Sequence, residues 1–334
     1  MCAMFPRVMT GIAETALAHH AITGVFPRWT FAGREINCMP GMHGLTLTYQ
    51  AIAHGLVDRE FERRALAAFL DTASGCSAFA SNQRVNKELR GLVANNGVLL
   101  AGARHTQTVS QTLEYAIVFE SIARLAARLG DAANAERFGA LARAYTRLYD
   151  PRARLLVALR ADGTRARVSD PTRASSMGES TEGNALQWLF HAPHDLSGLI
   201  ALVGEEDGFD AQLAALFDAT HSAADNLPDH TGLIGAYAHG NEPSHHIPFL
   251  LFLRGDAARG RAIVARLRAM YTDAPDGLCG NDDAGQLSAW YIAATIGVYS
   301  LDPLAPTLLS FDSSTSRLLS TDATEAQEIL DHFS

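Results

Sequence analysis

The chain has 334 residues, of which 48% are hydrophobic and 19% are charged, and its formal net charge is −9. This length and apolar content are enough for one large domain with its own core, and with so small a net charge they exclude an intrinsically disordered chain. The acidic balance argues against a nucleic-acid-binding protein, which would need a basic face, and no run of about 18 apolar residues could span a bilayer.

Helical periodicity dominates the sequence. A helix over 110–129 has its apolar residues near one stripe and is ended by Gly130. Asp131 is a suitable N-cap for the next helix, which ends before Pro151 because proline cannot continue a helix. In chain order the predicted helices cover 4–22, 43–56, 60–72, 110–129, 132–150, 194–203, 207–218, 243–253, 256–271 and 285–296. The best strand-like run is 155–159.

Several of these helices follow one another with short links, as in αα-hairpins. Long polar loops separate the pairs, and a compact domain seldom keeps such loops without a function. The loops cover 24–42, 73–109, 160–182, 219–242 and 272–285. Serial helical hairpins with long loops at one end predict an all-α fold, an (α/α)₆ toroid whose inner helices line a central pocket. An α-solenoid is the alternative, but no fixed-period repeat supports it.

Four segments combine carboxylates, amides and aromatic side chains. Acids and amides hydrogen-bond hydroxyl groups, and aromatic rings pack against apolar faces, so this combination is typical of a sugar pocket. The segments are PRWTFAGREINCMPGMHG at 27–44, STEGNALQWLFHAPHD at 180–195, HGNEPSHHIP at 239–248 and GNDDAGQLSAWY at 280–291.

Two carboxylates in these segments are candidates for acid–base chemistry. Glu182 precedes one predicted helix and Asp283 precedes another. Two such groups facing one pocket could divide the acid and base roles in glycosidic hydrolysis. Acidic residues at helix starts are also common as caps and as partners of the helix dipole, so the structural interpretation stays open.

The sequence also narrows the choice of metal. His245 and His246 are adjacent and would diverge by about 100° on a helix, and no HExxH motif is present, so zinc is disfavoured. Oxygen ligands from Asn241, Glu242 and the 281–283 loop suit Ca²⁺ better.

Motifs for phosphate binding, dinucleotide binding and an α/β-hydrolase nucleophile are missing. The four cysteines show no C-x-x-C spacing and are interpreted as buried or incidental thiols.

The same segments resemble signature stretches of glycoside hydrolase family 92. HGNEPSHHIP and GNDDAGQLSAWY carry the strongest likeness, and supporting matches in the family's order extend it over about 27–300. The resemblance implies an exo-acting, Ca²⁺-dependent, inverting α-mannosidase with an (α/α)₆ barrel. Its substrates would be α-1,2-linked and related mannosides on N-glycans or yeast mannan, with no nucleic-acid or membrane partner.

Residue roles follow from the positions within these motifs. The resemblance implies that Glu182 is the general acid and Asp283 the general base, with Asp282 beside it in the catalytic set. Asn241 and Glu242 are the expected ligands of the Ca²⁺ cofactor. The expected sugar-binding residues are Trp29, Glu35, His43, Gln187, His194 and His245.

The sequence also departs from the family pattern. Family members carry a β-sandwich domain before the barrel, and we expect 1–334 to be a single barrel domain that lacks it and is incomplete at its N-terminal end. Asn281 stands where some members have a further Asp, and Leu186 replaces a frequent aromatic residue. A catalytically impaired mannoside-binding remnant or a helical scaffold is therefore the alternative. Family members are commonly exported, but Met1–Arg7 lacks the order of a secretory signal, so the compartment stays open.

Overall fold

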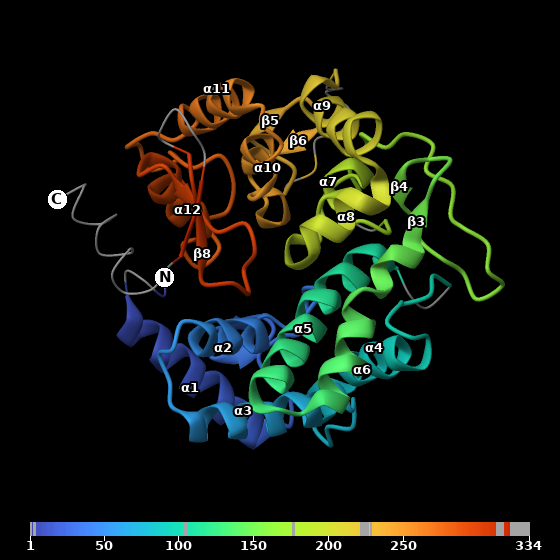
Figure 1. The fold of residues 1–334 in the computed structure, drawn as a ribbon, viewed down its shortest axis with the longest axis vertical. Coiled ribbons are helices and arrows are strands. Elements are labelled where there is room, and N and C mark those ends of the chain that lie inside the picture. The colour runs from blue at the N-terminus through green and yellow to red at the C-terminus, as the bar shows by residue number, and fades with distance from the viewer. Residues whose placement is uncertain are drawn as a thin grey trace. The chain divides into compact units, whose positions relative to one another are not determined.

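The computed structural model describes residues 2, 5–102, 106–175, 178–220, 227, 229–311 and 317–320. The chain separates into two compact units, which we describe one at a time (Figure 1). Unit 1 comprises Met1–Leu148, Ala158–Thr164 and Pro303–Pro306, and unit 2 comprises Tyr149–Val157, Arg165–Asp302 and Thr307–Ser334.

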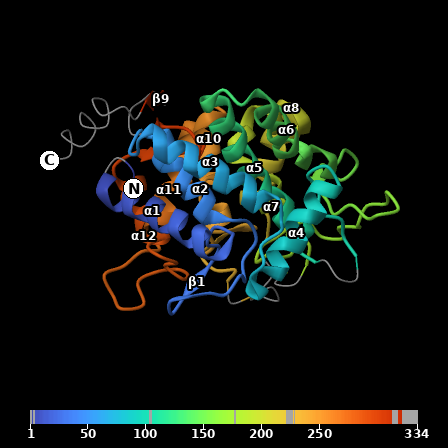
Figure 2. The same ribbon diagram turned by 90° about the horizontal axis from the view of Figure 1, so that it is seen from below.

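Unit 1 is a bundle of helices with one short hairpin. Helices α1, α2 and α3 contact one another, and α5 contacts α2, α3 and α6 (Figure 2). The helices are α1 (Pro6–Thr23), α2 (His43–Ala53), α3 (Arg59–Ala73), α4 (Gln83–Ala94), α5 (Thr108–Leu129) and α6 (Ala132–Ala142). The hairpin pairs β1 (Thr30–Phe31) with β2 (Arg34–Glu35) in antiparallel register.

Local signals explain where these helices begin and end. The Asp58 carboxylate accepts a hydrogen bond from the Phe61 amide at 2.8 Å and so caps α3. Gly130 ends α5 in the left-handed conformation (φ 85°), which costs glycine little. The Asp131 side chain then caps α6 by accepting from the Asn134 amide at 3.1 Å. These two caps confirm the predicted boundary between α5 and α6.

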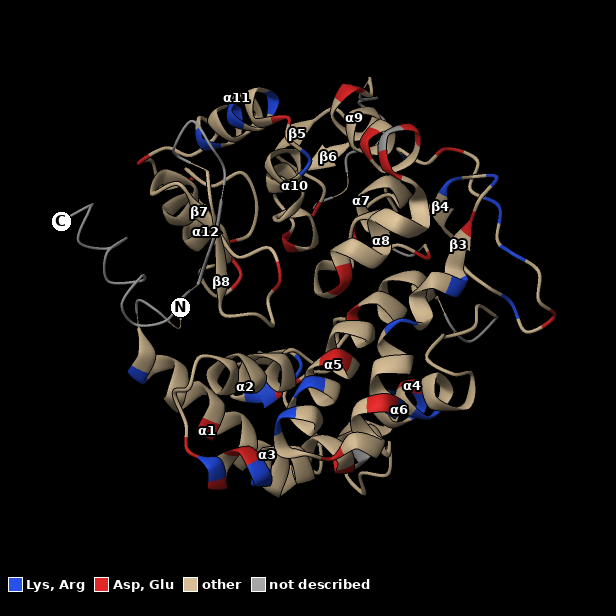
Figure 3. Ribbon diagram, viewed as in Figure 1, with Lys and Arg blue, Asp and Glu red and all other residues tan. Residues whose placement is uncertain are grey.

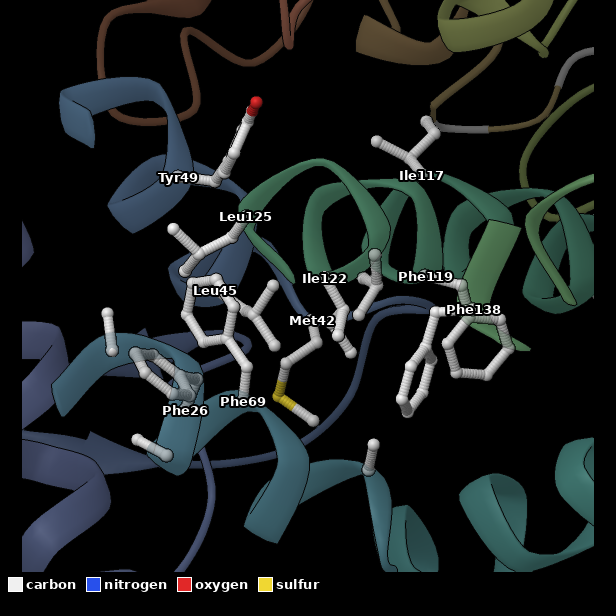
Figure 4. Packing of buried hydrophobic residues seen from close by; sticks show 14 of the residues in the cluster. Phe26, Met42, Leu45, Tyr49, Phe69, Ile117, Phe119, Ile122, Leu125 and Phe138 are labelled. Atoms are coloured by element: carbon white, nitrogen blue, oxygen red, sulfur yellow. The ribbon is translucent and has the colours of Figure 1, made fainter. Parts of the chain in front are cut away.

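The core of unit 1 lies between α5 and the helices around it. Figure 4 shows Phe26, Met42, Leu45 and Phe69 on the side of the earlier segments and Leu125 on α5. The rings of Phe26 and Phe69 meet edge to face with centroids 5.1 Å apart. Each large apolar side chain that is fully buried stabilises the fold by about 1.5–3 kcal/mol.

Unit 2 is built from shorter helices and small antiparallel sheets. Its helices are α7 (Ala185–Leu189), α8 (Leu196–Val203), α9 (Ala211–Asp218), α10 (Ile247–Leu253), α11 (Ala257–Arg268) and α12 (Gln286–Thr295). Its strands are β3 (Tyr149–Asp150), β4 (Leu155–Leu156), β5 (Leu233–Ile234), β6 (Tyr237–Ala238), β7 (Val298–Tyr299), β8 (Thr307–Ser310) and β9 (Arg317–Ser320). β3 pairs with β4, β5 with β6, and β7–β8–β9 form one sheet.

Aromatic side chains fill the interior of unit 2. Phe249 on α10 stacks on Tyr299 of β7 with ring centroids 4.0 Å apart. Trp290 on α12 is buried and its indole N–H donates to the His245 carbonyl at 3.0 Å. The outer helix α11 instead carries arginines, visible as its blue segments in Figure 3. The buried aromatic contacts therefore connect α10, α12 and β7.

The prediction of an all-α fold with few short strands is confirmed. Most predicted helices are present within a few residues of their expected bounds. No described helix is long and apolar enough to cross a membrane. The prediction of a single barrel domain stays a prediction.

Three local predictions are wrong. The expected loop 73–109 contains helix α4, whose buried Val85, Leu89 and Leu92 recur at helical spacing. The helix expected to reach residue 150 ends at Ala142, because the following residues form a 3₁₀ turn and then strand β3. The expected strand 155–159 is limited to the two residues of β4, since only these pair with β3.

Candidate active site

Three loops of unit 2 carry the residues predicted to do chemistry. Glu182 lies just before α7, Asn241 and Glu242 lie before α10, and Asp283 lies just before α12. The Asn241 side-chain amide donates to the Glu182 backbone carbonyl at 2.9 Å and to its carboxylate Oε2 at 3.3 Å. The charge of Asp283 acts on both Glu182 and Glu242. Residues 182, 241, 242 and 283 therefore form one cluster, which we call the carboxylate site.

Two of the three predicted catalytic residues, Glu182 and Asp283, have a left-handed backbone. Glu182 has φ 48°, and Asp283, Ala284 and Gly285 follow one another with φ 39°, 58° and 90°. Residues other than glycine adopt positive φ uncommonly and at a cost, and such residues cluster at functional sites. The fold thus maintains unfavourable backbone at the two positions that the sequence singles out.

The loop that carries Glu182 is held by local hydrogen bonds. Asn184 caps α7 by accepting from the Gln187 amide at 2.9 Å, and the Gln187 side chain accepts in return from the Asn184 amide at 3.0 Å. This is a capping box. The Asn184 side chain also donates to the Ala236 carbonyl at 2.7 Å, and the Trp188 indole donates to the Thr181 carbonyl at 2.9 Å. Glu182 is therefore presented by a loop braced on both sides.

Glu182 sits in an environment that favours its protonated form. Burial has the largest effect and raises the pKa of its carboxyl, and the negative charge of Asp229 raises it further. The hydrogen bond from Asn241 acts in the opposite direction, and the charge of Asp283 adds a smaller increase. The balance raises the pKa of Glu182 above its ordinary value, as a general acid requires.

Glu242 and Asp283 form a close carboxyl pair. Burial, and then the charge of Asp283 and hydrogen bonding with its carboxyl, raise the pKa of Glu242 well above its ordinary value, although a backbone hydrogen bond lowers it. The buried Glu242 Oε1 has no hydrogen-bond partner among the described residues. A buried carboxylate oxygen without a partner is costly, so this atom points to a bound cation, water or ligand.

Asp282 has a different environment from its neighbour Asp283. Its Oδ1 accepts hydrogen bonds from the Ser288 amide and from the Ser288 hydroxyl, both at 3.0 Å. Its backbone carbonyl accepts from the Gln286 amide at 2.7 Å. The Asp282 carboxylate therefore stabilises the first turn of α12. The carboxyl that hydrogen-bonds with Glu242 is that of Asp283.

Gln187 and His245 are buried in hydrogen-bond networks of unit 2. The Gln187 side-chain amide donates to the Ser244 hydroxyl at 2.6 Å, and its oxygen accepts from His230 Nε2 at 3.2 Å. His245 Nε2 donates to the His239 carbonyl at 2.9 Å, and Nδ1 accepts from the Gln286 amide at 3.2 Å. Burial lowers the pKa of His245 to about 4, so its ring is neutral near pH 7. These bonds connect the site loops to one another.

The other predicted sugar-binding residues are divided between the units. His194 is buried beside the start of α8 in unit 2. Trp29, Glu35 and His43 belong to unit 1. The Glu35 carboxylate accepts from the backbone amides of Trp29 at 3.0 Å and Asn37 at 2.7 Å, so it braces the loop that presents the half-buried Trp29.

Sequence reasoning missed two features of these loops. Asp229, in the long loop 219–242, influences Glu182 more strongly than Asp283 does. In unit 1 the fully buried Arg28 guanidinium contacts Glu88 and the Tyr115 hydroxyl. The PRW motif could have drawn attention to Arg28, which lies inside it. Its partners Glu88 and Tyr115 could not be predicted, because they are distant from Arg28 in the sequence. No comparable motif marks Asp229.

The loops of this all-α fold thus bring together several carboxylates, an amide and neighbouring aromatic residues, which are the side-chain types of a sugar-binding site. The model of the glycosyl hydrolase family 92 catalytic domain matches residues 1–315. The chain belongs to this family.

Solved structures of family members are similar to the chain. A family GH92 α-mannosidase, BT3965 from Bacteroides thetaiotaomicron, is 28% identical with a TM-score of 0.77, over 94% of this chain and 42% of that one. The same enzyme has been solved in complex with mannoimidazole. The inverting mannosidase BT2199 from Bacteroides thetaiotaomicron VPI-5482 shares the fold at 24% identity and a TM-score of 0.77, over 95% and 45% of the two chains.

The chain thus spans less than half the length of the solved relatives that it matches. No curated protein matches it.

Proposed function

We propose that this chain carries the acid–base machinery of an inverting, exo-acting α-mannosidase. The observation that carries the proposal is the carboxylate site, in which Glu182 and Asp283 both lie on left-handed backbone around the Asn241–Glu242 segment. Family membership and the similar inverting mannosidase support it.

Glu182 acts as the general acid in this proposal. Burial raises the pKa of its carboxyl and so favours the protonated form. In the protonated form Glu182 donates its proton to the glycosidic oxygen as the bond to the anomeric carbon breaks. The Asn241 amide, which donates to Oε2, orients the carboxyl and stabilises the carboxylate that remains after transfer. The leaving group departs as a neutral alcohol.

Asp283 acts as the general base. Its carboxylate takes a proton from a water molecule, whose oxygen attacks the anomeric carbon on the face opposite the leaving group. The products are β-mannose and the free alcohol, and the two carboxyls exchange protons with solvent to restore their starting states. The Asp282 carboxylate already accepts hydrogen bonds from the Ser288 amide and hydroxyl. We therefore assign the base role to Asp283 and a positioning role to Asp282.

The residues present also fit a hard cation. Ca²⁺ prefers carboxylate, amide and carbonyl oxygens, and the partnerless Glu242 Oε1 beside Asn241 supplies such donors. In the described part of the chain no three His, Cys, Asp or Glu side chains surround a common metal position, so the remaining ligands would be carbonyl, amide, substrate or water oxygens. A bound Ca²⁺ would neutralise the carboxyl pair and bind sugar hydroxyls.

The substrate class in this proposal is an α-1,2-linked or related mannoside on an N-glycan or mannan. The mannoimidazole complex of a similar α-mannosidase supports a mannoside as the substrate. The linkage and the exo mode rest on the family resemblance of the HGNEPSHHIP and GNDDAGQLSAWY segments.

The test measures mannose release from α-1,2-mannobiose by the purified chain with Ca²⁺, and the anomer first formed by NMR. We expect β-mannose from the wild type and a fall in kcat of at least about a hundredfold in Glu182→Gln and in Asp283→Asn. The matched control is Asp218→Asn, an exposed partner of Arg259, which should keep the wild-type rate.

Wild-type turnover in either site variant would remove that residue from its role. If α-mannose forms first, the inverting mechanism is wrong. If the chain binds mannobiose but does not cleave it, the binding-remnant alternative is correct. This outcome is included because the chain spans less than half the length of the solved relative.

A further inference from the structure

A groove of about 680 Å³ lies in unit 1 between helices α1 and α3, and residues of these two helices line it. The helices run in the same direction. The Thr10 hydroxyl of α1 donates to the Leu56 carbonyl just before α3 at 3.3 Å. Further along both helices, His20 Nε2 lies 3.1 Å from the Asp71 carboxylate. We call this feature the α1–α3 groove.

The floor of the α1–α3 groove is apolar and made of small residues. Ala18 and Ala21 of α1 and Ala67 of α3 line it and are exposed. In α3 no charged residue lies between Arg64 and Asp71. Short side chains on two neighbouring helices leave room for the side chains of a third helix to pack between them. The shape and composition of the groove therefore suit a helix as its occupant.

Two opposite charges lie beside this floor. Glu14 of α1 and Arg64 of α3 both line the groove and are both exposed. They are at nearly the same level, because Glu14 precedes His20 by six residues and Arg64 precedes Asp71, the partner of His20, by seven. Among the described residues neither Glu14 nor Arg64 has a hydrogen bond or an ion pair. The groove thus presents an unpaired acid and an unpaired base at one level.

We propose that the α1–α3 groove is an interface between two copies of this chain. A surface with an acid and a base at one level is complementary to itself. A two-fold axis through that level places Glu14 of one protomer beside Arg64 of its partner, and the symmetry forms the same ion pair a second time. Helix α1 of each protomer then packs on the alanines of the other protomer's groove.

The size of the groove face predicts a weak dimer. Helix α1 has 18 residues and is therefore about 27 Å long. Two helices of about 10 Å diameter are about 20 Å wide, so each protomer would contribute about 500 Å². The total of about 1,000 Å² is at the lower limit for a specific interface. We expect a reversible dimer with a Kd on the order of 10 μM.

The test measures the mass of the purified chain by analytical ultracentrifugation at concentrations below and above that Kd. We expect the wild type to change from monomer to dimer as the concentration rises. Ala18→Arg, at an exposed position of the groove floor, should raise Kd at least about tenfold and leave the melting temperature of dilute protein unchanged. The matched control is Lys87→Glu, a charge reversal at an exposed position of α4, which should keep the wild-type Kd.

Charge reversals test the two-fold arrangement itself. Glu14→Arg and Arg64→Glu should each raise Kd at least about tenfold, because a dimer of either variant with itself has like charges at both symmetric contacts. In a mixed dimer of the two variants both contacts again join opposite charges. We therefore expect each variant to be monomeric alone and an equimolar mixture to dimerise with about the wild-type affinity.

Three outcomes would overturn the proposal. A wild-type chain that stays monomeric at every concentration would assign the groove to an occupant other than a second copy. A dimer that persists in Ala18→Arg would place the interface elsewhere. A mixture of the two charge-reversal variants that does not associate would exclude the pairing of Glu14 with Arg64. None of these measurements uses mannoside hydrolysis, so the proposed function is tested separately.

Discussion

Replacing Gly280 by alanine tests whether the close packing of the Gly280 backbone on the Gly240 backbone fixes the position of the base. The new Cβ would lie 2.5 Å from the Gly240 carbonyl oxygen and 2.6 Å from its Cα, and both are backbone atoms that cannot rotate away. Ordinary Cβ contacts begin at about 3.4 Å, so one segment must move by about 3.4 − 2.5 = 0.9 Å. Asp283 and Glu242 lie a few residues along the two segments and would move with them.

Two magnitudes follow from that displacement. Overpacking of this kind costs about 1–3 kcal/mol of folding free energy. A misplacement of about 1 Å in a catalytic group can lower the rate about a hundredfold. We therefore expect Gly280→Ala to lower both the free energy of unfolding and kcat, with kcat falling far more than the folded fraction does.

The assay pairs urea unfolding, followed by near-ultraviolet circular dichroism, with mannobiose hydrolysis. Gly11→Ala is the matched control, because the same change inside α1 meets no atom within 4 Å. Alanine is preferred over glycine inside a helix, so this control should gain about 0.5–1 kcal/mol. If Gly280→Ala unfolds and turns over like the wild type, the contact between Gly240 and Gly280 does not position the base and our reasoning is wrong.

Three further predictions concern stability and the cation. Burial raises the pKa of Glu62, but the hydrogen bonds and charges of Arg128 and Arg59 together outweigh burial and lower it. The stabilisation from Glu62 is therefore complete above pH 4.5 and is lost as the pH falls. Glu62→Gln should flatten the acid limb of a stability–pH curve, and an unchanged limb would refute this. Treatment with a chelator should abolish mannoside hydrolysis and added Ca²⁺ should restore it, whereas full activity without metal would contradict the cation assignment. Arg28→Met should destabilise unit 1 by about 1.5–3 kcal/mol, because the buried Glu88 carboxylate loses one of its two arginine partners and keeps Arg84 and the Tyr115 hydroxyl. A melting curve like that of the wild type would count against this.

Much of the helical framework could be predicted because its signals are local. The Gly130–Asp131 boundary is one example, since a left-handed glycine and an aspartate cap act within one turn of the helix. Helix α4 was missed although Val85, Leu89 and Leu92 have helical spacing, because polar residues surround them. The end of α6 at Ala142 depends on pairing with β4, a partner that periodicity cannot identify.

The candidate site was predictable in its residue types and less so in its contacts. The motifs singled out Glu182, Asn241 and Asp283 because they concentrate acids and amides near helix starts. Neither the influence of Asp229 on Glu182 nor the glycine contact at Gly280 could be predicted, since both join segments at least 40 residues apart in the chain.

The hydrogen bonds divide the candidate residues into two groups. Gln187, His245 and Asp282 have hydrogen-bond partners that join α7, α10, α12 and their loops, so their polar groups already serve the fold. Glu242 Oε1 has no partner among the described residues, and Asp229 has one weak one. A buried polar group without a partner costs about 1–3 kcal/mol, and a cation or a substrate hydroxyl bound at Glu242 Oε1 would remove that cost. The chemistry of this chain should therefore be sought at the second group, and the first group should be treated as the frame that positions it.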